Sequence, residues 1–277
     1  MEIGKMRRLV LFLMIVSLNF SAGAVLVFSD DFEDGNRSGW YGFSDLDSAS
    51  PLTVKKDTGA GTLNSGYALF LTNPATYCSY WGAANINTIQ LVKPGDYIRL
   101  SIDLRLDGVI DSANGLRFGV FNSAGTPITY DSNGYAKSKD DAGYFMRIST
   151  GKYTDARITF EPGSDSFFMI GADMVQLYNS SLTFNDANKH HFDFDVKLTK
   201  DGGVEISLYV DGSFWASAQH SQSVVTTFNE IGFCSNKSGG VDFAIDNIAV
   251  AYIPEPATMV LGALGGLICL AGRKQTT

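Results

Sequence analysis

Apolar and polar residues alternate with a period of two through most of this chain, and this pattern restricts the fold more than any other feature. Along Ile98–Leu106 every even-numbered residue is isoleucine or leucine, and the residues between them are Arg, Ser, Asp and Arg. The same alternation recurs in Leu116–Val120, Phe192–Leu198 and Val204–Val210. Because neighbouring side chains of a strand point to opposite faces, each segment predicts a β-strand with one buried face.

Turn-forming residues separate these segments: Lys93-Pro94-Gly95-Asp96, Asp201-Gly202-Gly203 and Asp211-Gly212. The Asp-Gly pair suits a two-residue hairpin between Val204–Val210 and the segment that follows. No long amphipathic helix pattern interrupts the strands, and one-sided strands need a second sheet to cover their apolar face. We therefore predict one all-β domain over residues 25–252, an antiparallel β-sandwich of the jelly-roll type.

The N-terminal residues have the composition of an export signal. Three cations lie among the first eight residues, Leu9–Phe20 is almost wholly apolar, and the small residues Ala22 and Ala24 follow. This order is typical of a signal peptide at residues 1–24, cut by signal peptidase after Ala24. An uncleaved N-terminal membrane anchor is the alternative, although the apolar run is short for a span, which takes about 20 residues.

The last residues, 253–277, combine three elements. Pro254-Glu255-Pro256 comes first, the uncharged run Ala257–Gly272 follows, and Arg273 and Lys274 end it. The two prolines keep the tripeptide extended, and the cations would remain cytoplasmic. This order resembles the PEP-CTERM sorting signal of Gram-negative bacteria.

That resemblance implies that an exosortase, a membrane transpeptidase or protease, cuts near the tripeptide. It also implies a transient C-terminal helix in the inner membrane and a final location in the outer envelope or outside the cell. Such cargo is typical of organisms that make exopolysaccharide. The alternative is a plain C-terminal anchor in which Pro-Glu-Pro has no role.

The net charge limits the classes of binding partner, and the cysteine content bears on a possible disulfide. The net charge is −8, with 21 Lys and Arg against 29 Asp and Glu, which argues against nucleic acid as a partner. Of the three cysteines, Cys78 and Cys234 belong to the predicted domain. In an oxidising compartment they form a possible disulfide, and two buried thiols are the alternative.

A second resemblance rests on the segments "FSDDFEDGNRSGW", "VEISLYVDGSFWAS" and "VDFAIDNIAVAY". They are similar to laminin-G and concanavalin A-like jelly rolls, in which the first and last strands lie side by side. The apolar parity of the closing segment also slips by one residue at Asp246-Asn247, which predicts a β-bulge. Together these features place Asp31, Glu33 and Asp246 near one another and suggest a structural Ca²⁺. The alternative is that the acidic residues are solvated turn charges.

No arrangement of residues indicates catalysis. The chain has no strand with the carboxylate spacing of a glucanase, and Asp193 and Asp195 are interpreted as residues of a solvent face. Aromatic rings beside polar loops are candidate sugar platforms, and we select Tyr80, Trp81 and Tyr135 for this role.

The sequence therefore favours an exported, non-catalytic envelope or matrix protein that contacts carbohydrate, with exopolysaccharide as a possible partner. Two alternatives stay open. One is a degenerate glycan hydrolase or lyase on the same scaffold, and the other is a purely structural matrix subunit.

Overall fold

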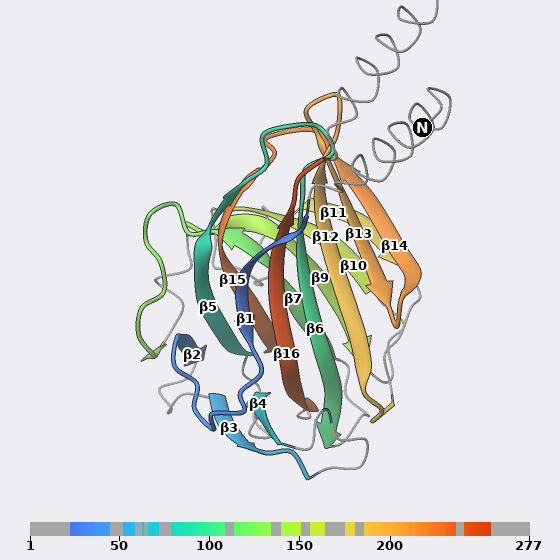
Figure 1. The fold of residues 1–277 in the computed structure, drawn as a ribbon. Helices are drawn as coiled ribbons and strands as arrows, with labels where there is room; N and C mark the ends of the chain where they lie inside the picture. Colours follow the sequence, from blue (N-terminus) through green and yellow to red (C-terminus); the bar gives the residue numbers. More distant parts are fainter. Residues whose placement is uncertain are drawn as a thin grey trace, which may run out of the picture.

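Strands account for most of the residues that the structure describes. The computed structural model describes residues 23–44, 52–58, 63, 66–71, 79–108, 114–133, 140–150, 156–163, 175–180, 186–236 and 241–255. They form two sheets packed face to face (Figure 1), which confirms the predicted β-sandwich. No helix lies in these ranges, so none of the described residues forms a helix that could cross a bilayer. The predicted signal peptide and the apolar run Ala257–Gly272 lie outside the described residues.

Sheet A, in front in Figure 1, has the order β14-β13-β12-β6-β16-β4-β3, and β1 also pairs with β16. Its strands are β1 (Val25–Asp30), β3 (Leu52–Lys56), β4 (Tyr67–Leu71), β6 (Tyr97–Gly108), β12 (His190–Leu198), β13 (Val204–Val210), β14 (Ser213–His220) and β16 (Val241–Ile253).

Sheet B lies behind it in the order β11-β10-β9-β7-β15-β5-β2-β8. Its strands are β2 (Trp40–Ser44), β5 (Ser79–Gln90), β7 (Asn114–Asn122), β8 (Ser132–Asn133), β9 (Ala142–Thr150), β10 (Ala156–Pro162), β11 (Val175–Ser180) and β15 (Thr227–Asn236). Among the described pairs, β2 with β8 is parallel and the others are antiparallel.

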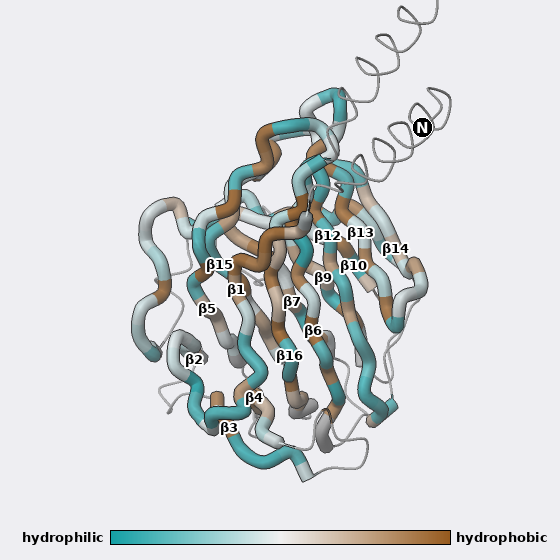
Figure 2. The backbone as a smooth tube through the Cα atoms, viewed as in Figure 1, coloured by the Kyte–Doolittle hydropathy of each residue, from teal (hydrophilic) through white to brown (hydrophobic). Residues whose placement is uncertain are grey.

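The period-two alternation determines which face of each strand is buried. The five apolar residues of Ile98–Leu106 are at most 1% exposed and pack between the sheets, and the polar residues of β6 point to the other face. In Figure 2 the front strands accordingly change between brown and teal along their length. Burying a large apolar side chain contributes about 1.5–3 kcal/mol, so these rows hold the register of the sheet.

The predicted hairpin and bulge are both present. Asp211 and Gly212 form a two-residue loop with φ of 51° and 75°, since Val210 pairs with Ser213. In β16 the register shifts between Asp246 and Ala249, and Asn247 has φ of 48°. The extra residue keeps the apolar residues on both sides of the bulge in the core.

Strand β16 has a different neighbour on either side of its bulge. It pairs with β6 along its length, with β4 before the bulge, and with β1 after it. The first and last strands of the domain therefore lie side by side, as the jelly-roll resemblance implies.

The two sheets differ in their outer faces. The outer face of sheet B carries a second apolar cluster, which includes Ile128 from the segment between β7 and β8; its buried members are Phe43, Trp81, Ala83, Phe121, Ile128, Phe145 and Cys234. On the outer face of sheet A, strands β6, β12 and β13 instead present polar side chains and tyrosines. This part of sheet A therefore offers polar and aromatic groups to a ligand.

Candidate functional site

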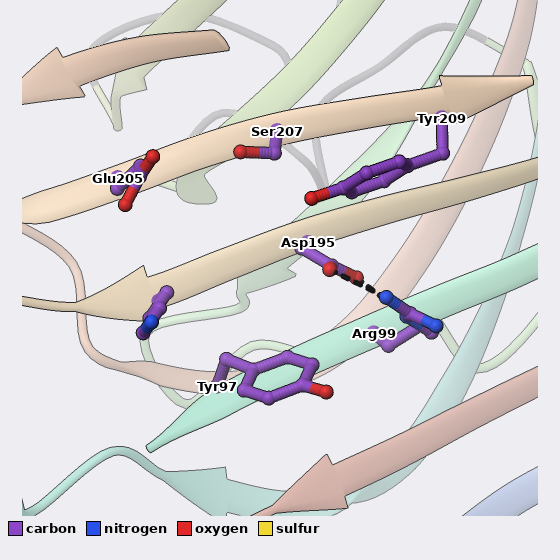
Figure 3. Close-up of a pocket in the computed structure, with 7 residues that line it drawn as sticks. Tyr97, Arg99, Asp195, Glu205, Ser207 and Tyr209 are labelled. Carbon is purple, nitrogen blue, oxygen red and sulfur yellow. Dashed lines mark hydrogen bonds and ion pairs between the residues drawn. The ribbon is translucent and has the colours of Figure 1, made fainter. Parts of the chain in front are cut away.

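A pocket of about 260 Å³ lies on the outer face of sheet A. Figure 3 shows residues from three adjacent strands pointing into it. They are Tyr97 and Arg99 from β6, Asp195 and Lys197 from β12, and Glu205, Ser207 and Tyr209 from β13. Register brings them together, because Asp195 pairs with Arg99 on one side and with Ser207 on the other.

An ion pair forms the floor of the pocket. The Nε and Nη2 atoms of Arg99 each donate to one oxygen of Asp195, both at 2.7 Å. The hydrogen bond with Asp195 raises the pKa of Arg99, so the guanidinium stays charged. Burial raises the pKa of Asp195, and the bonds from Arg99 oppose that change. A bidentate Arg–carboxylate pair of this kind has a fixed orientation.

Two tyrosines flank the guanidinium. Its carbon lies 5.8 Å from the ring centre of Tyr97 and 5.9 Å from that of Tyr209, within cation–π range. Phe214 then packs edge-on against Tyr209 at 5.8 Å and is 60% exposed. The pocket therefore combines flat rings with charged and hydroxyl groups, a combination that fits a ligand with apolar faces and many hydroxyls.

A polar network continues from the pocket along sheet A. Arg99 approaches Asp193 at 3.6 Å, and His191 lies between Asp193 and Asp103, at 3.4 Å and 2.8 Å respectively. Lys189 completes it with a 2.6 Å contact to Asp103. Asp193 and Asp195 thus lie on the outer face of sheet A, and Arg99 is the main partner of Asp195, which is buried.

A second pocket, of about 440 Å³, follows the junction of β1 and β16. Its lining is acidic on the β1 side and includes the bulge on the β16 side: Ser29, Asp30, Asp31, Asp34, Asn247, Ile248 and Ala249. Part of this acidic segment has a structural role, since Asp30 accepts hydrogen bonds from the Phe32 backbone and from Nε1 of the buried Trp40.

The predicted calcium ligands lie beside this pocket. Asp246 is fully buried and its Oδ2 has no hydrogen-bond partner. Burial, with repulsion from Glu33 and Asp103, raises the pKa of Asp246 to about 6. Glu33 and Asp31 are exposed, and Asp31 Oδ1 accepts the Glu33 amide. Within the described ranges no three His, Cys, Asp or Glu side chains converge closely enough to hold a metal ion. The buried oxygen available to a cation here is Oδ2 of Asp246.

Buried carboxyl groups also gather on the outer side of sheet B, and the sequence did not indicate them. Asp141, just before β9, and Glu230 in β15 are both fully buried, and neither side-chain oxygen of Asp141 has a hydrogen-bond partner. Burial, together with the charges of Asp140 and Glu161, raises the pKa of Asp141 to about 8. Burial and Asp141 likewise raise the pKa of Glu230. With a pKa of about 8, Asp141 holds its proton at neutral pH.

The predicted aromatic platforms have different outcomes. Trp81 is fully buried and stacks on Phe43 at 5.4 Å, so its assignment as an exposed platform is wrong. The prediction took Trp81 for a ring beside a polar loop, whereas Trp81 lies on β5, in the apolar cluster that covers the outer face of sheet B. Tyr135 and the side chain of Tyr80 lie outside the described residues. So does Cys78, and its bond to the buried Cys234 stays a prediction.

The start of the predicted sorting signal belongs to the folded domain. Ile253 is the last residue of β16 and pairs with Tyr97 of β6. Pro254 and Glu255 follow, and the Glu255 amide donates to Asp96 Oδ1 at 2.9 Å. Pro256, Arg273 and Lys274 lie outside the described residues.

The pocket on sheet A was not predicted. Its signal in the sequence was the occurrence of tyrosine at strand positions otherwise held by charged residues, namely Tyr97 and Tyr209. Three strands far apart in the sequence supply the lining, and only their register shows that they meet.

Comparison with known proteins identifies the chain's C-terminal segment. Residues 253–275 match the model of the PEP-CTERM protein-sorting motif. No curated protein sequence matches the chain.

Solved structures share the fold at low sequence identity. The T. cruzi calreticulin globular domain is 11% identical with a TM-score of 0.55, over 82% of this chain and 87% of that one. A Bacillus subtilis protein with a galectin-like fold is 10% identical with a TM-score of 0.55, over 83% and 98%. The Emp47p carbohydrate recognition domain is 12% identical with a TM-score of 0.50, over 85% and 98%. The domain therefore shares its two-sheet β-sandwich fold with these structures.

Proposed function

We propose that this PEP-CTERM protein is an exported, non-catalytic envelope or matrix protein that binds polysaccharide in the pocket between Tyr97 and Tyr209. The observation that carries the proposal is the Arg99–Asp195 pair held between two tyrosine rings. A sugar ring offers C–H faces to aromatic rings and hydroxyls to charged groups, and the pocket supplies both kinds of contact. Because the ion pair is already formed, little ordering is needed when a ligand binds.

The fold is compatible with this role. Emp47p contains a carbohydrate recognition domain by its name, and it shares this two-sheet architecture. At 12% identity that likeness concerns the fold, so the proposal depends on the pocket itself.

Binding to a panel of neutral and acidic polysaccharides tests the proposal. We expect Tyr209→Ala to weaken binding by about tenfold, the effect of losing one aromatic contact. Tyr130→Ala is the matched control, because Tyr130 is 53% exposed and precedes β8 of the other sheet. Absence of binding to every polysaccharide, or equal binding by both variants, would refute the assignment and leave a structural matrix subunit. Tyr80→Ala and Tyr135→Ala in the same assay test the two platforms that remain from the sequence.

An enzymatic role is the second candidate, and the buried carboxyl groups of sheet B favour it. Carboxyl groups with raised pKa values are typical of general acids. Asp141 and Glu230 are fully buried, so they would act in a glycan hydrolase or lyase only after this face of sheet B opens to the substrate. Release of reducing ends from the polysaccharide that binds, abolished by Glu230→Gln, would establish catalysis. Binding without any product would exclude it for that polysaccharide.

We also propose a structural Ca²⁺ beside Asp246, with Asp31 and Glu33 as its other ligands. The unsatisfied Oδ2 of Asp246 supports this proposal, because a buried carboxylate oxygen without a partner is costly and a cation would satisfy it. Calcium should raise the melting temperature of the wild-type protein and leave that of Asp246→Asn unchanged. The same melting temperature for the wild-type protein in calcium and in chelator would refute the site.

The sorting motif supports a proposal about processing partners. Signal peptidase would remove residues 1–24, and an exosortase-type enzyme would then act on the precursor in the inner membrane. Changing Pro254, Glu255 and Pro256 to alanine should leave unprocessed protein in the inner membrane fraction. Normal release of that variant would show that the motif is not used.

A further inference from the structure

The turn between β5 and β6 binds the beginning of the sorting motif. Asp96 is 1% exposed, and its carboxylate accepts four hydrogen bonds. Its Oδ2 accepts the amides of Val92 and Lys93 and the hydroxyl of Tyr252, at 3.1, 2.9 and 2.9 Å. Its Oδ1 accepts the Glu255 amide at 2.9 Å. One buried carboxylate thus joins the turn to the last strand and to the motif.

The turn is shaped to admit Glu255. Gly95 has φ of +99°, and a Cβ on this residue would lie 2.7 Å from Cγ and Cδ of Glu255. The Gly95 amide also donates to the Leu198 carbonyl at 2.7 Å, which fixes the turn to β12. The positive φ favours glycine at this position, and the absence of a Cβ lets the Glu255 side chain lie close to the turn.

This contact uses the single backbone donor of the tripeptide. Proline has no N–H, so of Pro254, Glu255 and Pro256 only Glu255 can donate a backbone hydrogen bond, and Asp96 accepts it. Glu255 itself remains exposed. An enzyme that binds this segment would therefore contact the exposed side chain of Glu255, while the Glu255 backbone is already bonded to the domain.

The same end of the sandwich exposes apolar side chains. Val92 of the turn is 67% exposed, and Val25, which pairs with Tyr252, is 54% exposed. In Figure 1 the β5–β6 connection and the end of β16 meet at the top of the molecule. The uncharged run Ala257–Gly272 begins two residues after Glu255, so this end faces whatever surface the tail enters.

We infer that Asp96 is a positioning residue for the sorting reaction. It holds the start of the motif on the surface of the sandwich, and the processing enzyme recognises the motif and the β5–β6 turn as one unit. This inference rests on the proposed exosortase processing. The motif would then work best at a fixed distance from the domain, rather than as an independent peptide.

An insertion tests this without disturbing either part. Four residues, Gly-Ser-Gly-Ser, are placed between Ile253 and Pro254 of the full chain, and precursor and processed forms are compared by immunoblot in cells that contain the exosortase. The matched control has the same insertion between Asp201 and Gly202, in the exposed turn that joins β12 to β13. We expect the first insertion to slow processing by about tenfold, the effect of losing one hydrogen bond to a charged group, and the control to be processed normally.

Point variants separate positioning from folding. Asp96→Asn should slow processing, whereas Tyr252→Phe removes a bond to Asp96 without touching Glu255 and should have a smaller effect at a similar melting temperature. Unchanged or faster processing after the insertion at Ile253 would overturn the inference. Failure of the underlying sorting proposal would be recognised separately, because the triple-alanine variant of the motif would then be processed normally.

Discussion

Replacing Asp141 by asparagine should stabilise the protein, and increasingly so as the pH rises. The Asp141 side chain is fully buried without a hydrogen-bond partner, and burial raises its pKa from 3.8 to about 8. Asparagine has the shape of a protonated aspartic acid and carries no charge. The substitution therefore removes mainly the cost of keeping this group neutral.

The size of the effect follows from the pKa difference. The folded state binds a proton that the unfolded state releases between about pH 4 and pH 8, so stability from this group is lost as the pH rises through that window. At about 1.4 kcal/mol for each pKa unit, the cost is about 4 kcal/mol at pH 7 and about 2 kcal/mol at pH 5. Asp141→Asn should recover most of it at each pH.

Chemical denaturation of the purified wild-type and Asp141→Asn proteins at pH 5 and pH 7 measures both values. Asp31→Asn, compared in the presence of chelator, is the control, since it makes the same chemical change at an exposed position. A variant less stable than the wild type at pH 7, or a gain that is equal at both pH values, would refute the assignment of a buried neutral carboxyl group. A comparable gain in Asp31→Asn would instead indicate a general effect of net charge.

Three further predictions concern particular contacts. Gly119→Ala should lower the free energy of unfolding, measured by denaturation, by about 3 kcal/mol, because the new Cβ would collide with the Tyr144 carbonyl oxygen of the neighbouring strand. A variant as stable as the wild type would show that β7 and β9 can separate. Gly212→Ala should cost only about 1 kcal/mol, since nothing lies near its Cβ and φ of 75° is the sole obstacle; a cost as large as that of Gly119→Ala would contradict the distinction. Burial lowers the pKa of His190, but the hydrogen bonds with Asp211 and Asp186 raise it by more, so the net shift is upward. The protonated His190 therefore stabilises the folded state at low pH, and this stabilisation is lost as the pH rises through the raised pKa. NMR titration should find a lower His190 pKa in Asp186→Asn, and an unchanged value would mean that this contact does not form in solution.

Local patterns in the sequence were sufficient for the strands and their connections. The alternation in Ile98–Leu106 correctly assigned the buried face of β6, and the parity slip at Asp246-Asn247 correctly located the bulge. Asp211-Gly212 likewise forms the predicted hairpin. Each of these features depends on residues only a few positions apart, so it can be predicted from the sequence alone.

Local sequence patterns could not show which of the two sheets has a covered outer face. Most other residues of β5, the strand that contains Trp81, are small or polar. This composition is equally consistent with an outer face that is open to solvent and with one that is covered. Ile128, more than forty residues away, packs in the same cluster and belongs to a segment between two strands. Such a segment has no periodicity that would show where it folds back.

The sequence by itself determined the β-sandwich, the bulge and the PEP-CTERM sorting motif, because the pattern that indicates each one consists of consecutive or alternating residues. Only the tertiary structure decided that Arg99 and Asp195 meet between two tyrosines, that Asp141 and Glu230 are buried, and that Asp96 binds Glu255. Arg99 and Asp195 are 96 positions apart in the sequence, and Asp96 and Glu255 are 159 positions apart. The register of antiparallel strands, rather than any local preference, brings such residues together.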